Sequence, residues 1–285
     1  MAPTLEKVQR ERFREGETVM IIEPRGKPHF VRLKSGGRFY HRRTGYIDHE
    51  SIIGAPPGGL FSSESGITFI CLRPTLEEYI LKKLHRKTSI IHPKDLASIL
   101  VRGDIYPGAR VVEAGVGSGA TTIFLLRHLG GEGSLVSYER REDFIDLARK
   151  NIEEVHRLLG HSNCPHVIRH RDVYENGFEE EDQDLVVIDV PEPHRVVGSA
   201  LAALRPGGVF LSWLPTVNQV YILGRELQRQ RQWAGVEVRE TLERAWTVAE
   251  GAMRPSPRMV GHTGFWVRAR KLEDATDFSE KTSEL

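Results

Sequence analysis

A run of alternating glycines gives this chain its clearest potential for chemistry. The segment Glu113-Ala-Gly115-Val-Gly117-Ser-Gly119 follows the β-branched pair Val111-Val112 and precedes an apolar helical run. Glycines in this arrangement let a strand turn sharply into a helix and let a ligand approach the backbone closely. The N-terminus of the helix then offers backbone N–H groups that have no partner within the helix. We therefore interpret this segment as a binding site for a nucleoside cofactor.

Acidic residues follow the next strands along the chain at regular intervals. Glu139, Asp172 and Asp189 each stand at or just beyond the carboxyl end of an expected strand, where open α/β sheets bind ligands. Glu139 is placed to accept hydrogen bonds from two ribose hydroxyls, and Asp172 to accept one from an adenine amine. For Asp172, a solvated acid in a turn is an equally good interpretation. Pro191 and Pro193 stiffen the loop behind Asp189, which we assign to the acceptor side of the site.

The elements that position these residues alternate between strand and helix from Ala109 onward. This alternation predicts a parallel sheet covered on both faces. After Trp233 two strands, Val236–Ala249 and Thr263–Arg270, follow without a helix, so the sheet should end in an antiparallel hairpin. The other expected strands are Arg110–Glu113, Ser134–Glu139, His166–His170, Asp184–Asp189 and Val209–Trp213, and the expected helices are Thr121–Leu129, Asp143–Leu159, Arg195–Leu204 and Val217–Arg229.

Short β-type runs separated by glycine and proline occupy the N-terminal part of the chain. They predict a small β-rich domain over residues 1–74, followed by a helical connector over 75–108. The α/β domain should then cover 109–272, and residues 273–285 should form a charged, disordered tail. The expected N-terminal strands are Thr18–Ile22, His29–Leu33, Arg38–His41 and Ile67–Leu72, and a helix is expected over Thr75–Leu84.

One of these strands combines basic and aromatic residues. Arg38, Arg42 and Arg43 surround Phe39 and Tyr40, a pattern that suits contact with phosphates and stacking on bases. The alternative is a hairpin whose alternate residues face solvent. Because 40 Lys and Arg residues nearly balance 39 Asp and Glu residues, any affinity for nucleic acid must come from such local patches.

Composition narrows the class of protein further. The sequence shows no apolar run of membrane-spanning length and no signal peptide, so we expect a cytoplasmic protein without a membrane partner. Cys71 and Cys164 are far apart and outside any CxxC spacing, and the histidines near Cys164 fit no standard zinc pattern. We therefore expect no metal. Trp213 and Trp246 are interpreted as core residues.

The glycine motif alone leaves the cofactor open, because Gly115-x-Gly117-x-x-Ala120 with Glu139 about twenty residues later also fits a nicotinamide fingerprint. Three features favour S-adenosylmethionine. Gly119 adds a third alternating glycine, so that the segment resembles motif I of class I methyltransferases. Asp172 supplies a second acid after the third strand. The terminal antiparallel hairpin resembles the Rossmann-like sheet of that class and is not expected of a dinucleotide fold.

Motifs along most of the chain resemble one family, the tRNA (adenine-58-N1)-methyltransferases of bacteria and archaea and their eukaryotic catalytic-subunit relatives. The resemblance departs from the family at His92, where Tyr or Phe is common, and at His194, where Trp is common. The matching segments are Arg73-Pro74-Thr75 with Tyr79, Ile91-His92-Pro93-Lys94-Asp95, Glu113 to Gly119, Ser137-Tyr138-Glu139, Asp189-Val-Pro-Glu-Pro193, Thr216-Val-Asn-Gln219 and Gly261-His-Thr-Gly-Phe265.

The resemblance implies methylation of N1 of adenine 58 in the T-loop of tRNA, and in some archaeal members also of adenine 57, by a cytoplasmic homotetramer. Asp189 would be the catalytic residue, orienting the adenine through its N6 amine. The implied cofactor-binding residues are Glu113, Gly115, Gly117, Ser118, Gly119, Ala120, Thr121, Glu139, Asp172 and Asp189. For Glu113, ordering the loop is an alternative to contact with the methionine moiety. The implied substrate-binding residues are Tyr79, His92, Arg38, Arg42, Arg43 and His262.

Two other functions remain open at this point. A related class I methyltransferase could act on a different acceptor, either a protein or a small molecule. The chain could also be a non-catalytic tRNA-binding subunit, although such paralogues lose the glycine motif or the catalytic acid, and this chain retains both.

Overall fold

The computed structural model describes residues 12–160, 163–249 and 251–273, and the segment from residue 274 onward, expected to be a tail, lies outside these ranges. The chain divides into two compact units. The first extends to His85 and includes the segment that starts at Lys150, and the second runs from Arg86 to Arg149 and resumes at Asn163. No helix in the described ranges combines the length and apolar composition that crossing a bilayer requires.

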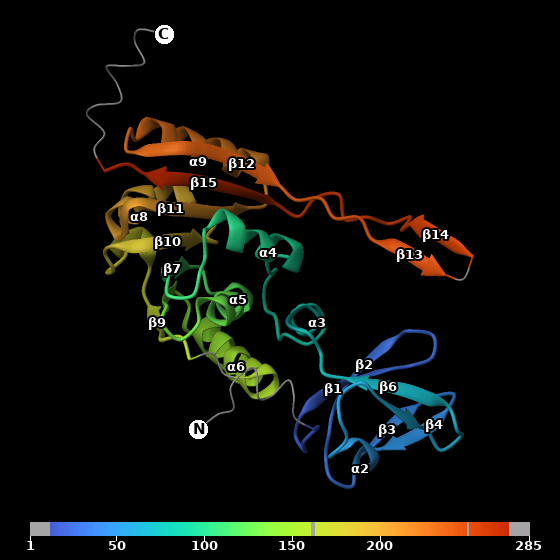
Figure 1. The fold of residues 1–285 in the computed structure, drawn as a ribbon. Coiled ribbons are helices and arrows are strands. Elements are labelled where there is room, and N and C mark those ends of the chain that lie inside the picture. The colour runs from blue at the N-terminus through green and yellow to red at the C-terminus, as the bar shows by residue number, and fades with distance from the viewer. Residues whose placement is uncertain (1–11, 161–162, 250, 274–285) are drawn as a thin grey trace. The chain divides into compact units, whose positions relative to one another are not determined.

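A seven-stranded sheet forms the centre of the second unit (Figure 1). Its order is β12-β15-β11-β10-β7-β8-β9, and β15 is antiparallel to both of its neighbours while the other paired strands are parallel. The chain proceeds from β7 to β8 on one side and returns through β10 on the other, so the topological switch lies between β7 and β10. The parallel strands are β7 (Arg110–Ala114), β8 (Ser134–Glu139), β9 (His166–His170), β10 (Gln183–Ile188) and β11 (Leu204–Leu214).

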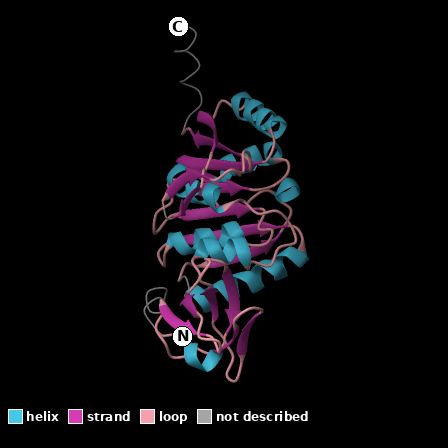
Figure 2. Cartoon of the chain, turned by 90° about the vertical axis from the view of Figure 1, so that its right-hand side faces the viewer, coloured by secondary structure: helices cyan, strands magenta, loops and turns pink. Residues whose placement is uncertain are grey.

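Helices lie on both sides of this sheet (Figure 2). One face of the strands, including Val112, Val186 and Phe210, packs with apolar residues of α8 and α9 in a single buried cluster. The expected helix over Arg195–Leu204 begins earlier, as a 3₁₀ turn at Pro193, because proline has no N–H to leave unpaired at a helix start. The helices are α4 (Pro93–Arg102), α5 (Ala120–Leu129), α6 (Glu142–Leu159), α7 (Val173–Asn176), η1 (Pro193–Val196), α8 (Val197–Ala203) and α9 (Val217–Arg229).

The C-terminal part confirms the antiparallel ending of the sheet but corrects the expected strand over Val236–Ala249. The main sheet contains β12 (Trp233–Glu240) and β15 (Phe265–Lys271), with β15 inserted between β11 and β12. Between them, β13 (Trp246–Ala249) and β14 (Ala252–Pro255) form a separate hairpin that extends away from the sheet (Figure 1). Trp213 is 7% exposed, as expected, but Trp246 is 55% exposed, so the prediction that Trp246 is a core residue is wrong.

The first unit is β-rich, as the punctuation of the sequence predicts. Its strands form a four-stranded antiparallel sheet, in the order β2-β1-β6-β5, and a β3-β4 hairpin around a core that includes Val19, Ile47 and Phe69. The four-residue strands β4 and β5 each begin with glycine and were not anticipated. The elements are β1 (Thr18–Ile22), β2 (Pro28–Arg32), β3 (Arg38–His41), β4 (Gly45–Asp48), α2 (His49–Ile52), β5 (Gly59–Ser62), β6 (Thr68–Leu72) and α3 (Leu76–Lys82).

Candidate active site

The glycine bend links β7 to α5 at the topological switch. Gly115, Gly117 and Gly119 all have positive φ, at 91°, 53° and 82°, which L-residues with side chains rarely adopt. A Cβ atom on Gly115 would also lie 2.1 Å from the backbone oxygen of Asp189. The Asp189 N–H donates to the carbonyl of Ala114 at 2.8 Å, which fixes the end of β10 against the bend. Position 115 therefore requires glycine, because other residues rarely adopt this φ and because a side chain would collide with the backbone of Asp189.

Glu113 lies beneath the bend and does not line the open pocket. Glu113 is only 1% exposed, and its Oε2 accepts hydrogen bonds from the hydroxyls of Thr122 at 2.8 Å and Ser137 at 2.7 Å. Burial raises the pKa of Glu113 to about 7, although the two hydroxyls lower it in part. This geometry supports the alternative role, in which Glu113 orders the loop, and does not support direct contact with the cofactor.

Glu139 connects the bend to the end of β8. Its Oε2 accepts a hydrogen bond from Gly117 N at 3.1 Å, and its Oε1 accepts one from Arg141 N at 3.1 Å. A carboxylate oxygen can accept more than one hydrogen bond, so Glu139 retains acceptor capacity toward the pocket that it lines. Two ribose hydroxyls are suitable donors for that capacity.

Asp172 lies at the start of α7, beside a second part of the cleft. Its Oδ1 accepts a hydrogen bond from Tyr174 N at 2.9 Å, and its Oδ2 lies 3.6 Å from Arg140 Nη1. It lines this part of the cleft together with Tyr138, Glu139 and Asp189. Asp172 thus caps a short helix, which agrees with its interpretation as an acid in a turn. It also faces the cleft, which leaves its interpretation as an acceptor for an adenine amine open.

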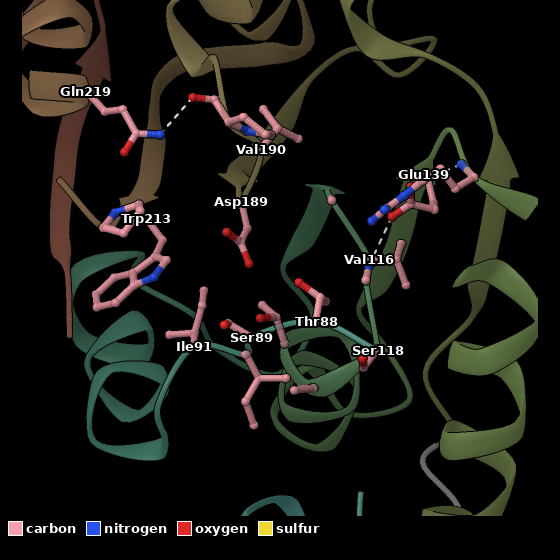
Figure 3. A pocket seen from close by; sticks show the side chains of 18 residues that line it. Thr88, Ser89, Ile91, Val116, Ser118, Glu139, Asp189, Val190, Trp213 and Gln219 are labelled. Carbon is pink, nitrogen blue, oxygen red and sulfur yellow. Dashed lines mark hydrogen bonds and ion pairs between the residues drawn. The ribbon is translucent and has the colours of Figure 1, made fainter. Parts of the chain in front are cut away.

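A pocket opens from the glycine bend toward the end of β11 (Figure 3). It shares Gly115, Glu139, Asp189 and Val190 with the part that Asp172 lines, so the two form one continuous cleft. Figure 3 shows Asp189 at its centre, between Trp213 on one side and Glu139 on the other. The other lining residues include Thr88, Ser89, Ile90, Ile91, Val116, Gly117, Ser118, Ala120, Thr121, Arg141, Pro191, Pro215 and Gln219.

Carboxyl groups and guanidinium groups both line the cleft, and Asp189 is the carboxyl group nearest its centre in Figure 3. Burial, together with the negative charge of Glu139, raises the pKa of Asp189 to about 7. No hydrogen bond from the described residues reaches the Asp189 carboxylate. Asp189 is therefore an available acceptor in the cleft, which suits a hydrogen-bond donor and, when Asp189 is ionised, a nearby cationic group.

The residues predicted to bind substrate have different surroundings. Tyr79 is fully buried in α3, so its predicted contact with substrate is not supported. His92 caps α4 by accepting from Lys94 N, next to the pocket residue Ile91. His262 is bonded to Glu240 and to the carbonyl of Pro215, another lining residue. These two histidines therefore lie near the cleft without lining it.

The basic residues belong to the β3-β4 hairpin of the first unit. Arg38 pairs with Asp48 at 2.8 Å and lies over the ring of Tyr46, and Arg42 and Arg43 are exposed in the turn. Tyr40 is 70% exposed on the same hairpin. Exposed guanidinium groups beside an exposed aromatic ring retain the chemistry that the sequence suggested for nucleic-acid contact.

Several pocket residues were missed by the sequence analysis. Trp213 was assigned to the core, yet it also lines the pocket, and its place at the end of a central strand was the signal that could have revealed this. Gln219 in α9 donates to the carbonyl of Pro191 at 2.9 Å and so holds the loop after Asp189. The residues Thr88 to Ile90 show no periodicity, and no sequence signal assigned them to the pocket.

Comparisons with known proteins agree with this geometry. The family described as "tRNA methyltransferase complex GCD14 subunit" matches residues 68–259, and the family "TrmI-like N-terminal" matches residues 12–60. The chain is 33% identical to a tRNA (adenine(58)-N(1))-methyltransferase TrmI of Thermus thermophilus, over 89% of this chain and 96% of the relative. It is 30% identical to a tRNA (adenine(57)-N(1)/adenine(58)-N(1))-methyltransferase TrmI of Methanocaldococcus jannaschii, over 92% and 98%.

Solved structures lead to the same fold. The tRNA (m1A58) methyltransferase TrmI of Aquifex aeolicus is 29% identical and superposes with a TM-score of 0.80 over 92% of this chain and 100% of that one. A protein of Thermotoga maritima described as a SAM-dependent O-methyltransferase is 30% identical, with a TM-score of 0.84 over 93% and 96%. The fold is thus that of a class I S-adenosylmethionine-dependent methyltransferase, and the chain belongs to the tRNA (adenine-N1)-methyltransferase family.

Proposed function

We propose that this chain transfers the methyl group of S-adenosylmethionine to N1 of adenine 58 in the T-loop of tRNA. The observation that carries the proposal is the position of Asp189. Its carboxylate faces the open cleft beside the glycine bend, at the switch point of a sheet that belongs to this family. Adenine 57 is a second candidate position, because the Methanocaldococcus jannaschii relative is named for both positions.

The cleft fits the proposed cofactor in shape and charge. Gly115 lets the backbone of Asp189 approach the glycine bend closely, and Glu139 keeps acceptor capacity for ribose hydroxyls. Asp172 is placed to accept from the adenine amine of the cofactor, in the part of the cleft beside Tyr174. The nearby carboxyl groups of Asp189 and Glu139 favour a sulfonium cation, which supplies an electrophilic methyl group when it is bound.

Asp189 is the proposed orienting residue for the acceptor. The N1 of neutral adenine carries a lone pair, so the ring is itself the nucleophile and needs no strong base. A carboxylate that accepts a hydrogen bond from the N6 amine would orient the ring and push electron density toward N1. It would also stabilise the positive charge of the methylated product. Most of the acceleration would then come from positioning.

Incubation of unmodified tRNA with the protein and S-adenosylmethionine tests this function directly. Nucleoside mass spectrometry and mapping of the modified position should find 1-methyladenosine at position 58. N6-methyladenosine would instead indicate amino methylation, and a methylated hydroxyl would indicate the acceptor class named for the Thermotoga maritima neighbour. A tRNA that stays unmodified, with retained cofactor binding, would favour a non-catalytic subunit.

Access to the target base requires binding energy. T-loop bases are stacked in folded tRNA, and exposing one costs a few kcal/mol. We propose that Arg38, Arg42 and Arg43 supply part of this energy through phosphate contacts. We also assign the reaction to the cytoplasm, a location that is consistent with the modification of tRNA.

The proposed assembly is a homotetramer, and the β13-β14 hairpin is its candidate contact. Trp246, Val248 and Met253 on this hairpin are 55%, 76% and 71% exposed. A contiguous set of exposed apolar side chains commonly marks an association surface. Sedimentation should show that Trp246→Ser with Val248→Ser reduces the oligomeric state, whereas Val101→Ser, which changes an exposed valine on α4, should not. An unchanged oligomer in the double variant would refute this assignment.

A further inference from the structure

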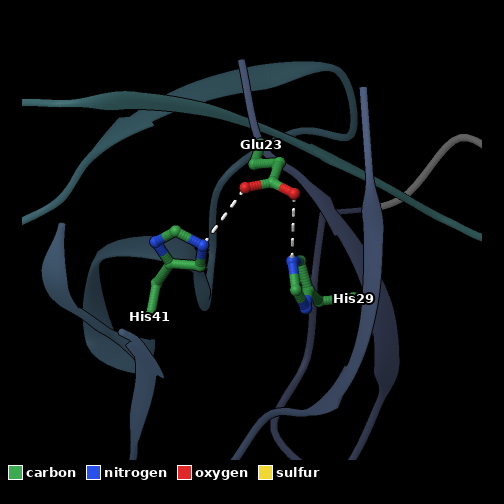
Figure 4. Close-up of side chains that lie close together, drawn as sticks. All are labelled: Glu23, His29 and His41. Atoms are coloured by element: carbon green, nitrogen blue, oxygen red, sulfur yellow. Dashed lines mark ion pairs between the residues drawn. The ribbon is translucent and has the colours of Figure 1, made fainter. Parts of the chain in front are cut away.

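Three potential metal ligands converge in the first unit, outside the candidate active site (Figure 4). Glu23 follows β1, His29 lies in β2 and His41 ends β3. One ligand atom from each residue lies within 4.8 Å of the other two. The three residues come from different parts of the first unit, since Glu23 lies after β1 and the two histidines lie in β2 and β3. Six positions separate Glu23 from His29, and twelve separate His29 from His41. No sequence motif could therefore reveal them.

Their separations suit one tetrahedral ion. Two ligands bound to zinc at about 2.1 Å with tetrahedral angles lie ~3.4 Å apart. His41 Nε2 lies 3.1 Å from Glu23 Oε2, and His29 Nε2 lies 3.9 Å from Glu23 Oε1. These two distances end on different oxygens of Glu23, and the ligand atoms of the three residues lie within 4.8 Å of one another. Side-chain shifts of roughly 1.5 Å or less would therefore bring all three groups to bonding distance.

The two imidazoles are prepared for this role in different ways. The His41 Nδ1 atom lies 2.8 Å from the hydroxyl of Thr44, and an Nδ1–H that donates to this hydroxyl leaves Nε2 with its lone pair toward Glu23. His29 Nε2 is buried and has no hydrogen-bond partner among the described residues. A buried nitrogen without a partner is rare and calls for an explanation.

Aromatic rings enclose the cluster on its inner side. His29 packs against Phe39 at 5.2 Å between ring centroids, and His41 packs against Phe69 at 5.7 Å. In β3, Phe39 and His41 are two positions apart, so their side chains point to the same face of the hairpin. An apolar shell of this kind limits water access and strengthens the binding of an ion by charged and polar ligands.

From this convergence we propose that Glu23, His29 and His41 form a zinc site with three protein ligands and a fourth position for water. The ion would join the four-stranded sheet, which contains β1 and β2, to the β3-β4 hairpin. Its role would be structural, because it would fix the hairpin that carries Arg38, Arg42 and Arg43. Zn²⁺ suits this ligand set since it accepts imidazole nitrogen and carboxylate oxygen in four-coordinate geometry.

The test uses the full chain, first stripped of metal with a chelator and then titrated with ZnCl₂ alone. Calorimetry and elemental analysis should find about one tightly bound Zn²⁺ per chain, with release of protons, because the ligands must be deprotonated. Co²⁺ in place of Zn²⁺ should give the absorption bands of a tetrahedral site. Zn²⁺ should also raise the melting temperature of the protein.

Variants decide which residues hold the ion. Loss of a group that only orients a metal ligand weakens metal binding by roughly 10- to 100-fold. His29→Gln and His41→Gln, which remove proposed ligands, should each weaken zinc binding by more than about 100-fold. Thr44→Val, which removes the hydroxyl beside His41, should weaken it by ~10-fold. His85→Gln, which changes an exposed histidine of the same unit, should bind like the parent chain. If a ligand variant fails to fold without metal, the Co²⁺ spectrum of Thr44→Val remains informative, because that variant retains all three ligands. The proposal is overturned if the parent chain binds no Zn²⁺ in the micromolar range, or if the folded double variant His29→Gln/His41→Gln binds it equally well.

Discussion

The titration of Asp189 provides the sharpest test of its role. The proposed hydrogen bond from the adenine N6 amine requires the ionised carboxylate, and burial raises the pKa of Asp189 to about 7. With that pKa, about one tenth of the carboxyl groups are ionised at pH 6 and about nine tenths at pH 8. We therefore expect kcat/KM for the cofactor to rise roughly tenfold between these two pH values and then to level off.

Removing the group gives a second magnitude. A hydrogen bond to a charged group contributes about 1.5–3 kcal/mol, which corresponds to a rate loss of roughly 10- to 150-fold. Asp189→Ala should show a loss of this size in kcat with saturating tRNA and cofactor, and Asp189→Asn should remove the rise with pH. The assay is transfer of a labelled methyl group to unmodified tRNA, with cofactor affinity measured separately by calorimetry.

Glu113 is the necessary control, because burial raises its pKa to about 7 as well. Glu113→Gln should keep the pH profile of the parent chain, since Glu113 lies beneath the bend and does not face the pocket. The argument fails if Asp189→Asn retains the tenfold rise, or if Asp189→Ala retains near-normal turnover while it still binds the cofactor. If the rise of kcat/KM with pH were lost in Glu113→Gln and kept in Asp189→Asn, Glu113 and not Asp189 would be the group whose ionisation controls activity.

Three further outcomes follow from the same structure. Gly115→Ala should abolish cofactor binding and lower the melting temperature, since its Cβ would collide with the Asp189 carbonyl, whereas Gly224→Ala, at an open position in α9, should not. Calorimetry should show that Glu139→Gln weakens cofactor binding by roughly 10- to 100-fold through loss of a charge-assisted acceptor, and unchanged affinity would exclude its ribose contact. Replacing Arg42 and Arg43 by Ser should reduce the slope of log affinity for tRNA against log salt by about 2, and a constant slope would remove both from the phosphate contacts.

The stability of the cofactor-free protein should follow the opposite pH trend from activity. The folded pKa of Asp189 is raised above its unfolded value, so the folded state holds the proton more tightly. Stability is then fully present below the unfolded pKa and declines as the pH rises toward about 7. Asp189→Asn should therefore raise the melting temperature, relative to the parent chain, more at pH 8 than at pH 5.

The sequence predicted those parts of the site that local pattern determines. Alternating glycines after a β-branched strand located the bend, and the acid at the end of the next strand located Glu139, because strand ends of a parallel sheet meet at one edge. It could not determine the orientation of Glu113. A strand covered on both faces is apolar throughout, so its sequence does not show which side chains face the ligand.

Tertiary arrangement accounts for the other differences. Tyr79 has the polar tip of a binding residue, and only the packing around α3 shows that it is buried. Trp246 is apolar enough for a core, but the hairpin that carries it leaves the sheet, so hydrophobicity alone predicted the wrong environment. The Glu23, His29 and His41 cluster depends on which strands become neighbours, and that information is absent from any short stretch of sequence.

The hydrogen bond between Asp189 N and the Ala114 carbonyl fixes the distance between two parts of the candidate active site. Asp189, which is proposed to orient the acceptor, follows β10, and the bend proposed to hold the methyl donor follows Ala114 at the end of β7. Because these two strands are paired, this one backbone hydrogen bond determines the spacing between acceptor and donor. Surface loops and the small N-terminal unit can diverge in evolution, and so alter which nucleic acid is presented, without disturbing that spacing. Redesign for a new acceptor should accordingly leave this hydrogen bond intact and change the pocket-lining residues around Trp213 and Gln219.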